Sequence, residues 1–94
     1  MIVSFRSKAL EPFWWKGEVR RVDARHVERL RRLLADLEDA KAPEDMNLPG
    51  SYFHPLVGDQ SGRYAVRVNK NWRLTFGWSD HGPDALDVDY EDYH

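Results

Sequence analysis

The sequence predicts an α+β fold, in which two N-terminal helices pack on one face of a small antiparallel β-sheet. In roughly the first 40 residues, apolar side chains recur at the three- and four-residue spacing of helices. After about residue 50 the spacing changes to two, which is typical of half-buried strands, and turn residues separate the alternating segments. At 94 residues the chain should form a single domain spanning 1–94.

The helical part contains two amphipathic patterns, preceded by a short β-prone segment at residues 2–5. Ser7 is a suitable cap for the first helix, and Gly17 should end it. Asp23 is a suitable N-cap for the second helix, which should continue to about residue 40. The apolar stripe of this second helix consists of Val27, Leu30, Leu33, Leu34 and Leu37.

Four strands are expected in the rest of the chain, at residues 52–56, 63–68, 71–78 and 86–91, with a tight turn at 69–71. In each strand, alternate residues point to opposite faces of the sheet. The large apolar residues that should face the helices are Tyr64, Val66, Val68, Trp72, Leu74, Phe76, Leu86, Val88 and Tyr90. The other face then presents the polar residues Arg67, Arg73, Thr75, Asp87, Asp89 and Glu91. A function should be sought on that polar side of the sheet.

The charge of the chain is polarised, although its net charge is only −2. Residues 5–32 contain nine Lys or Arg and four acids, residues 63–73 contain four cations and no acid, and residues 80–94 contain six acids and no Lys or Arg. Such a pattern permits a local phosphate site on a globally acidic protein. The second helix also carries an arginine stripe, which is either a solvated face or a contact for an acidic partner or RNA. It consists of Arg25, Arg29 and Arg32.

The chain has no cysteine, which excludes disulfides and thiolate metal sites. It has no apolar run near the ~20 residues that a membrane span needs. Its first five residues also lack the charged and apolar pattern of a signal segment. We therefore expect a cytoplasmic protein without membrane association.

Three motifs appear in order along the second half: YFHPLVGD at residues 52–59, NWRLTF at 71–76 and YEDYH at 90–94. With DMNLPG at residues 45–50, they resemble the HigB family, the plasmid maintenance killer toxins of type II toxin–antitoxin pairs within the RelE superfamily. The resemblance implies a RelE-like microbial RNase fold and ribosome-dependent endonuclease activity on mRNA. It also implies two kinds of partner, the ribosome with its mRNA and a HigA-like antitoxin that carries a helix-turn-helix.

By the same resemblance, the catalytic residues of the family correspond to His54, Arg73, Asp92, Tyr93 and His94. Cleavage of RNA by its own 2′-hydroxyl needs a base, an acid and cations for the phosphorane, and it requires no metal or cofactor. We expect His94 to be the acid, because its own carboxylate and Asp92 favour the imidazolium, and His54 to be the base or a phosphate orienter. Tyr93 is suited to stack on a base. The further ligands expected for RNA phosphates are Arg63, Arg67 and Lys70.

Some of these residues also have a purely structural interpretation. His54 can be an ordinary residue at the end of a strand. Arg73 can be the cross-strand partner of Asp87 or Asp89. The two remaining histidines, one on a helix and one in a loop, are expected at the surface. They are His26 and His81.

Val57 stands where the family usually carries Lys, so one expected phosphate contact is missing. Together with the acidic net charge, this departure supports an alternative function. In that alternative, the chain is a catalytically weak or inactive toxin-fold module that acts with its antitoxin as a transcriptional co-repressor. A metal-dependent hydrolase is a more distant alternative.

Overall fold

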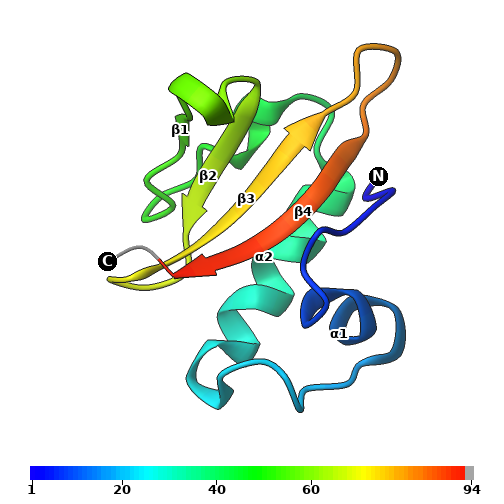
Figure 1. Ribbon diagram of the computed structural model, residues 1–94, viewed down its shortest axis with the longest axis vertical. Coiled ribbons are helices and arrows are strands. Elements are labelled where there is room, and N and C mark those ends of the chain that lie inside the picture. The colour runs from blue at the N-terminus through cyan, green and yellow to red at the C-terminus, as the bar shows by residue number, and fades with distance from the viewer. Residues whose placement is uncertain (93–94) are drawn as a thin grey trace.

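A computed structural model describes residues 1–92 and contains two α-helices and a four-stranded antiparallel sheet (Figure 1). The helices are α1 (Leu10–Lys16) and α2 (Val27–Asp39). The strands, which neighbour one another in chain order, are β1 (His54–Pro55), β2 (Arg63–Arg67), β3 (Trp72–Trp78) and β4 (Ala85–Asp92). Short 3₁₀ helices are η1 (Ala24–His26), η2 (Pro43–Met46) and η3 (Gly58–Gln60). The predicted fold class is confirmed.

The hydrophobic core lies between the helices and the face of the sheet that they cover (Figure 1). From α2, it takes the predicted apolar stripe apart from its half-buried first member: Leu30, Leu33, Leu34 and Leu37. From the sheet, it takes Val66, Leu74, Phe76, Ala85 and Val88. Burying one leucine side chain stabilises a fold by about 1.5–3 kcal/mol, so this stripe determines which side of α2 faces the sheet.

The residues predicted to bound the helices make the expected local contacts, although Asp23 caps η1 and α2 itself begins only at Val27. The Ser7 hydroxyl accepts the backbone N–H of Leu10 at 3.2 Å and so caps the chain as it enters α1. This helix ends at Gly17, whose φ of 71° is the left-handed conformation that glycine adopts without strain. The Asp23 carboxylate accepts the N–H of Arg25 at 2.9 Å and caps η1, which leads directly into α2.

The strand predicted at residues 2–5 is wrong. In its place, two isolated parallel bridges join this segment to β4, Ile2 with Ala85 and Phe5 with Val88. The bridges remain separate because β4 is bulged: Asp87 has a φ of 49°, and the register of β4 against β3 shifts at this point. Backbone hydrogen bonds still tie the N-terminal segment to β4, so it covers this edge of the sheet.

Two further predictions need correction. β1 has two residues in place of the five predicted at 52–56, because Tyr52 has a φ of 50° that an extended strand does not allow. His26 was expected at the surface but is only 2% exposed. It precedes Leu30 by four positions and therefore lies on the buried side of the helix. His81 is exposed, as expected. Within the part of the chain described above, no helix has the length and apolar character to span a membrane.

Candidate active site

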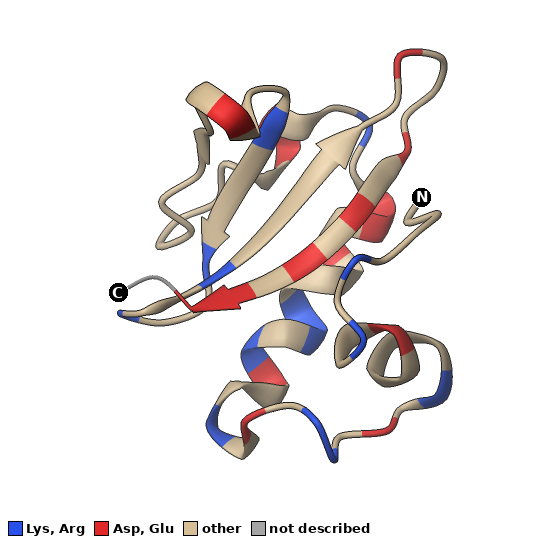
Figure 2. Cartoon of the chain, in the orientation of Figure 1, with Lys and Arg blue, Asp and Glu red and all other residues tan. Residues whose placement is uncertain are grey.

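The sheet face opposite the helices carries two rows of residues that run across the strands and are polar apart from Ala65. Residues paired directly across antiparallel strands project to the same face. The first row is His54, Ala65, Thr75 and Asp89, and the second is Arg67, Arg73 and Glu91. We call these two rows the polar face. Figure 2 shows the same division of charge, with Lys or Arg where β2 and β3 meet their connecting turn and acids along β4.

His54 lies on the edge strand β1, and its side chain is exposed. Its Nδ1 lies 3.0 Å from the backbone carbonyl oxygen of Tyr52. Because a carbonyl oxygen only accepts, Nδ1 carries a proton and donates it, which leaves Nε2 as the unprotonated nitrogen of the neutral ring. A ring fixed in this tautomer offers its Nε2 lone pair to a substrate, as a general base requires.

Arg67 and Arg73 occupy directly opposed positions on β2 and β3. Like charges in this relationship destabilise a sheet. The guanidinium of Arg67 lies over the ring of Tyr52, with 4.8 Å from Cζ to the ring centroid. The Nη1 of Arg73 donates to the backbone carbonyls of Asn69 at 2.8 Å and Trp72 at 3.1 Å. Guanidinium groups bind phosphate oxygens through paired hydrogen bonds, so two of them on neighbouring strands are chemically suited to an anion site.

The end of β4 lies beside this pair. Glu91 is directly opposite Arg73, so the acid in register with this arginine is the glutamate rather than either of the aspartates considered from the sequence. Asp92 pairs with Trp72, one position further along the same strands. The first residue of the predicted Asp-Tyr-His motif is therefore at the same end of the sheet as the two arginines. The other two, Tyr93 and His94, lie outside the described residues.

Arg63 lies apart from the other predicted phosphate ligands, at the far end of β2. It is only 8% exposed, and its Nη2 donates to the Thr75 hydroxyl at 3.1 Å and to the Asp87 carbonyl at 2.9 Å. The Thr75 hydroxyl donates onward to the Glu91 carboxylate. Burial lowers the pKa of the Arg63 guanidinium, and repulsion from Arg6 acts in the same direction. Arg63 therefore stabilises the polar face through buried hydrogen bonds to β3 and β4.

Lys70 is exposed on the turn that connects β2 to β3. Asn69 holds this turn, because its side-chain oxygen accepts the backbone N–H groups of Asn71 and Trp72, both at 2.9 Å. The backbone carbonyl of the same asparagine accepts a hydrogen bond from the guanidinium of Arg73. One residue thus fixes both the turn and the arginine, and it places Lys70 at the same end of the sheet.

His26, which sequence analysis missed, supports the turn from the core side. Because the side-chain oxygen of Asn69 is committed to the turn, the amide nitrogen faces the imidazole and donates to Nε2 at 2.6 Å. Nε2 is therefore the acceptor, and the protonated Nδ1 donates to the Tyr90 hydroxyl. The rings of Trp72 and Tyr90 contact the imidazole from the same side, with centroids 5.8 and 5.9 Å away from it and 4.4 Å from each other. The helical phase of His26, four residues before Leu30, is the signal that could have placed it inside.

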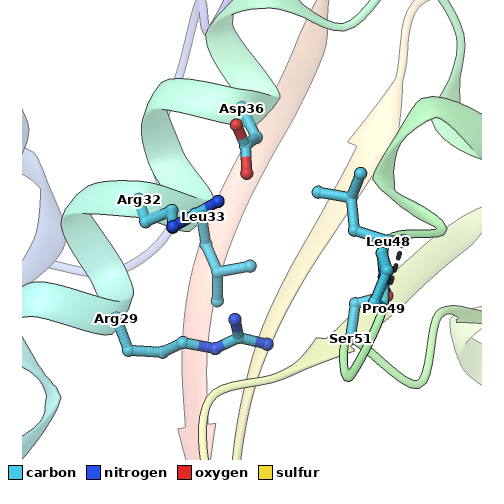
Figure 3. A pocket seen from close by; sticks show the side chains of 7 residues that line it. All are labelled: Arg29, Arg32, Leu33, Asp36, Leu48, Pro49 and Ser51. Atoms are coloured by element: carbon cyan, nitrogen blue, oxygen red, sulfur yellow. Dashed lines mark hydrogen bonds between the residues drawn. The ribbon is translucent and has the colours of Figure 1, made fainter.

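A pocket of about 410 Å³ lies elsewhere, between α2 and the segment that precedes β1 (Figure 3). Its lining residues are Arg29, Arg32, Leu33, Asp36, Leu48, Pro49 and Ser51. None of these belongs to the polar face, so the pocket and the candidate site are separate. Among residues 1–92, no three His, Asp or Glu side chains are grouped so that they could hold a metal ion.

Sequence comparison finds relatives that match along the chain. A family model described as RelE-like toxin of type II toxin–antitoxin system HigB matches residues 3–94. The protein named Endoribonuclease HigB from Proteus vulgaris is 36% identical over 94 residues, which are 100% of both chains. The protein named Toxin HigB-1 from Vibrio cholerae serotype O1 is 37% identical over 82 residues, covering 85% of this chain and 86% of that one.

Solved structures share the fold at much lower identity. A YoeB/ParE toxin from Agrobacterium tumefaciens has a TM-score of 0.57 at 21% identity, covering 99% of this chain and 96% of that one. YafQ from E. coli strain BL21(DE3) has a TM-score of 0.56 at 18% identity, covering 98% and 91%. A YoeB–YefM complex from Staphylococcus aureus has a TM-score of 0.58 at 17% identity, covering 100% and 98%. The RelE-like fold expected from the sequence motifs is thereby confirmed.

Proposed function

This chain belongs to the HigB-like family of RelE-like toxins of type II toxin–antitoxin systems, and we propose that it is an endoribonuclease that cleaves mRNA on translating ribosomes. The name of the full-length Proteus vulgaris relative supports the endoribonuclease activity. The observation that carries the proposal is the arrangement of the polar face. Arg67 and Arg73 are directly opposed there, and in the neighbouring row Nδ1 of His54 is engaged by the Tyr52 carbonyl, so that Nε2 is the nitrogen left to face a substrate.

In the proposed reaction, Nε2 of His54 removes the proton of the 2′-hydroxyl beside the scissile phosphate, and the 2′-oxygen attacks phosphorus. Arg73 and Arg67 bind the phosphate oxygens and stabilise the charge of the phosphorane. His94 gives a proton to the 5′-oxygen as the bond from phosphorus to that oxygen breaks. The products are a 2′,3′-cyclic phosphate and a 5′-hydroxyl. The two imidazoles transfer the protons, and the guanidinium groups stabilise the negative charge of the phosphorane. The proposed chemistry is therefore metal-independent and uses no cofactor.

Three further predicted residues have supporting roles in this proposal. Asp92, at the end of β4 beside the arginine pair, favours the imidazolium form of His94. Tyr93 stacks on a base of the mRNA. Lys70 binds a neighbouring phosphate from its exposed position on the turn.

Membership of this family implies an antitoxin partner. The YoeB–YefM complex from Staphylococcus aureus shares the fold of this chain, and in it YoeB is assembled with YefM. We propose that the partner of this chain is a HigA-like antitoxin with a helix-turn-helix. The ribosome and mRNA are the other proposed partners, and they place the action of the protein in the cytoplasm.

The test is an in vitro translation reaction in which primer extension detects mRNA cleavage, with and without ribosomes. We expect ribosome-dependent cleavage that leaves 2′,3′-cyclic phosphate ends, and loss of cleavage in His54→Ala, Arg73→Ala and His94→Ala at unchanged helix content by circular dichroism. Arg31→Ala is the matched control, because Arg31 pairs with Glu28 on the surface of α2 at 2.9 Å. Full cleavage by Arg73→Ala, or 3′-hydroxyl ends made without ribosomes, refutes the proposal.

One observation favours the alternative function. Val57 is 84% exposed, so an apolar side chain occupies the surface where the family pattern led us to expect a lysine. A toxin-fold module that serves only as a co-repressor needs no such cation. Tight antitoxin binding together with neither growth arrest nor mRNA cleavage supports this alternative, and cleavage by the wild-type protein excludes it.

A further inference from the structure

Tyr52 is exposed between two anchored neighbours. The carbonyl of Ser51 accepts the backbone N–H of Arg67 at 2.7 Å, and the hydroxyl of Ser51 donates to the Met46 carbonyl at 3.0 Å. On the other side, the ring of Phe53 stacks against Tyr64, with centroids 5.7 Å apart and planes at 9°. The Tyr52 side chain between them is nevertheless 65% exposed. Its exposure is therefore imposed by a held backbone.

The backbone of Tyr52 is in an uncommon conformation. Its φ of 50° lies in the left-handed region, where a side chain with a Cβ is strained and where glycine or asparagine is more usual. A bulky aromatic residue in this position has a strained backbone, and its ring points outward. Such outliers concentrate at functional sites, where the strain positions a side chain or a carbonyl group.

The strained residue also contacts two components of the candidate site. Its carbonyl oxygen accepts a hydrogen bond from Nδ1 of His54, which sets the tautomer of that ring. One face of its phenol ring lies under the guanidinium of Arg67, which stands directly opposite Arg73. Tyr52 therefore contacts the candidate base through its backbone carbonyl and one of the candidate phosphate cations through its ring.

We propose that Tyr52 is a stacking platform for a nucleobase of single-stranded RNA next to the cleaved phosphate. Arg67 backs one face of the ring, which leaves the other face to receive a base. Every nucleobase has a π-face, so the ring can stack on any base. The cations beside the ring bind the phosphates of the same strand. This subsite rests on the proposed ribonuclease function, because it positions the strand whose phosphate lies at Arg67 and Arg73.

The experiment measures binding without cleavage. Ribosomes are programmed with an mRNA that has a 2′-deoxy nucleotide at the cleavage position and 2-aminopurine as the neighbouring base, so that stacking on an aromatic ring quenches its fluorescence. Wild-type protein and Tyr52→Phe should bind and quench. Tyr52→Leu and Tyr52→Gly should bind about ten- to one-hundredfold more weakly, without quenching. Val57→Ala is the control for loss of an exposed apolar side chain and should behave as wild type.

Two readouts separate this role from a structural one. Tyr52→Gly relieves the left-handed strain, so it should be at least as resistant to urea as wild type while losing RNA affinity. Tyr52→Leu should leave the salt dependence of binding unchanged, whereas Arg67→Ala should reduce its slope by about 1.

Binding by Tyr52→Leu and Tyr52→Gly at wild-type affinity, or wild-type binding without quenching, overturns the subsite. Binding and quenching by a wild-type protein that never cleaves the unmodified mRNA has a different meaning. That result refutes the nuclease function and leaves the RNA subsite in place.

Discussion

Arg67 and Arg73 face each other directly across β2 and β3, in a row of the sheet that continues to Glu91 on β4. Opposed cations destabilise a sheet by roughly 0.2–1 kcal/mol compared with a neutral pair. Glu91 offsets part of this cost in the same row, and an anion that accepts hydrogen bonds from both guanidinium groups offsets more of it.

Inorganic phosphate should therefore raise the melting temperature more than chloride does at the same ionic strength. A ligand of the folded state alone adds about 0.4 kcal/mol when its concentration equals Kd, which is a shift of roughly 2–3 °C for a domain of this size. Arg67→Ala and Arg73→Ala should each lose most of this shift, and Arg31→Ala on α2 should keep it. Equal shifts in all three variants would show that phosphate acts elsewhere.

His26 should affect cleavage through Asn69 and the turn that holds Arg73. His26→Gln keeps an acceptor for the amide of Asn69, whereas His26→Asn keeps a donor for Tyr90 and loses reach toward the turn. Each loses one buried hydrogen bond, so both should be destabilised by about 1–3 kcal/mol in urea unfolding. Only His26→Asn should also lower kcat for mRNA cleavage, with little change in KM. Matching kcat values in the two variants would contradict a role in positioning the arginine.

Periodicity predicted the features that burial controls. The stripe of α2 and the alternation of β2 and β3 could be read from the sequence, because each requires apolar residues at fixed spacing. The same reading separated the two faces of the sheet and therefore found the arginine pair. The helical spacing of His26, four residues before Leu30, also indicated a buried position. Its polar ring nevertheless led us to expect it at the surface.

Alternation does not reveal how deeply a side chain is buried on the face to which it points. Arg63 was expected beside the other phosphate ligands, but small residues occupy the middle of that face, and its long side chain lies across them toward Thr75. The left-handed φ of Tyr52 has no sequence signal either, because tyrosine rarely adopts it. Such features come from tertiary packing.

Tyr90 should make the fold sensitive to alkaline pH. Burial, together with the nearby Asp23 carboxylate, raises the pKa of its hydroxyl to about 12 from an ordinary value of about 10. The folded state therefore holds this proton more tightly than the unfolded state does. Its contribution to stability is complete below pH 10 and is lost as the pH rises from about 10 to about 12.

Urea midpoints between pH 8 and pH 11 test this dependence on Tyr90. Wild type should lose stability above pH 10, and Tyr90→Phe should lose less over the same interval, because it has no hydroxyl at this position. A parallel decline in the two proteins would mean that other tyrosines or lysines govern the alkaline transition.

Arg63 and Arg67 both lie on β2, but we expect Arg63 to be a structural cation and Arg67 an RNA-binding cation. Alanine substitutions at the two positions should therefore have different effects. Arg63→Ala leaves the Thr75 hydroxyl and the Asp87 carbonyl without their buried donor, so it should lower the free energy of unfolding by about 1–3 kcal/mol. Arg67 is half-buried and donates no comparable bond to any core residue between positions 1 and 92, so Arg67→Ala should change stability by less than about 1 kcal/mol.

Binding of programmed ribosomes over a range of salt concentrations gives the second measurement. Each phosphate contact contributes about one unit to the slope of log K against log salt, so Arg67→Ala should reduce the slope by about 1. Arg63→Ala, measured where it is fully folded, should keep the wild-type slope, since its guanidinium is engaged inside the protein. A reduced slope for Arg63→Ala would instead mean that this side chain leaves Thr75 to meet phosphate.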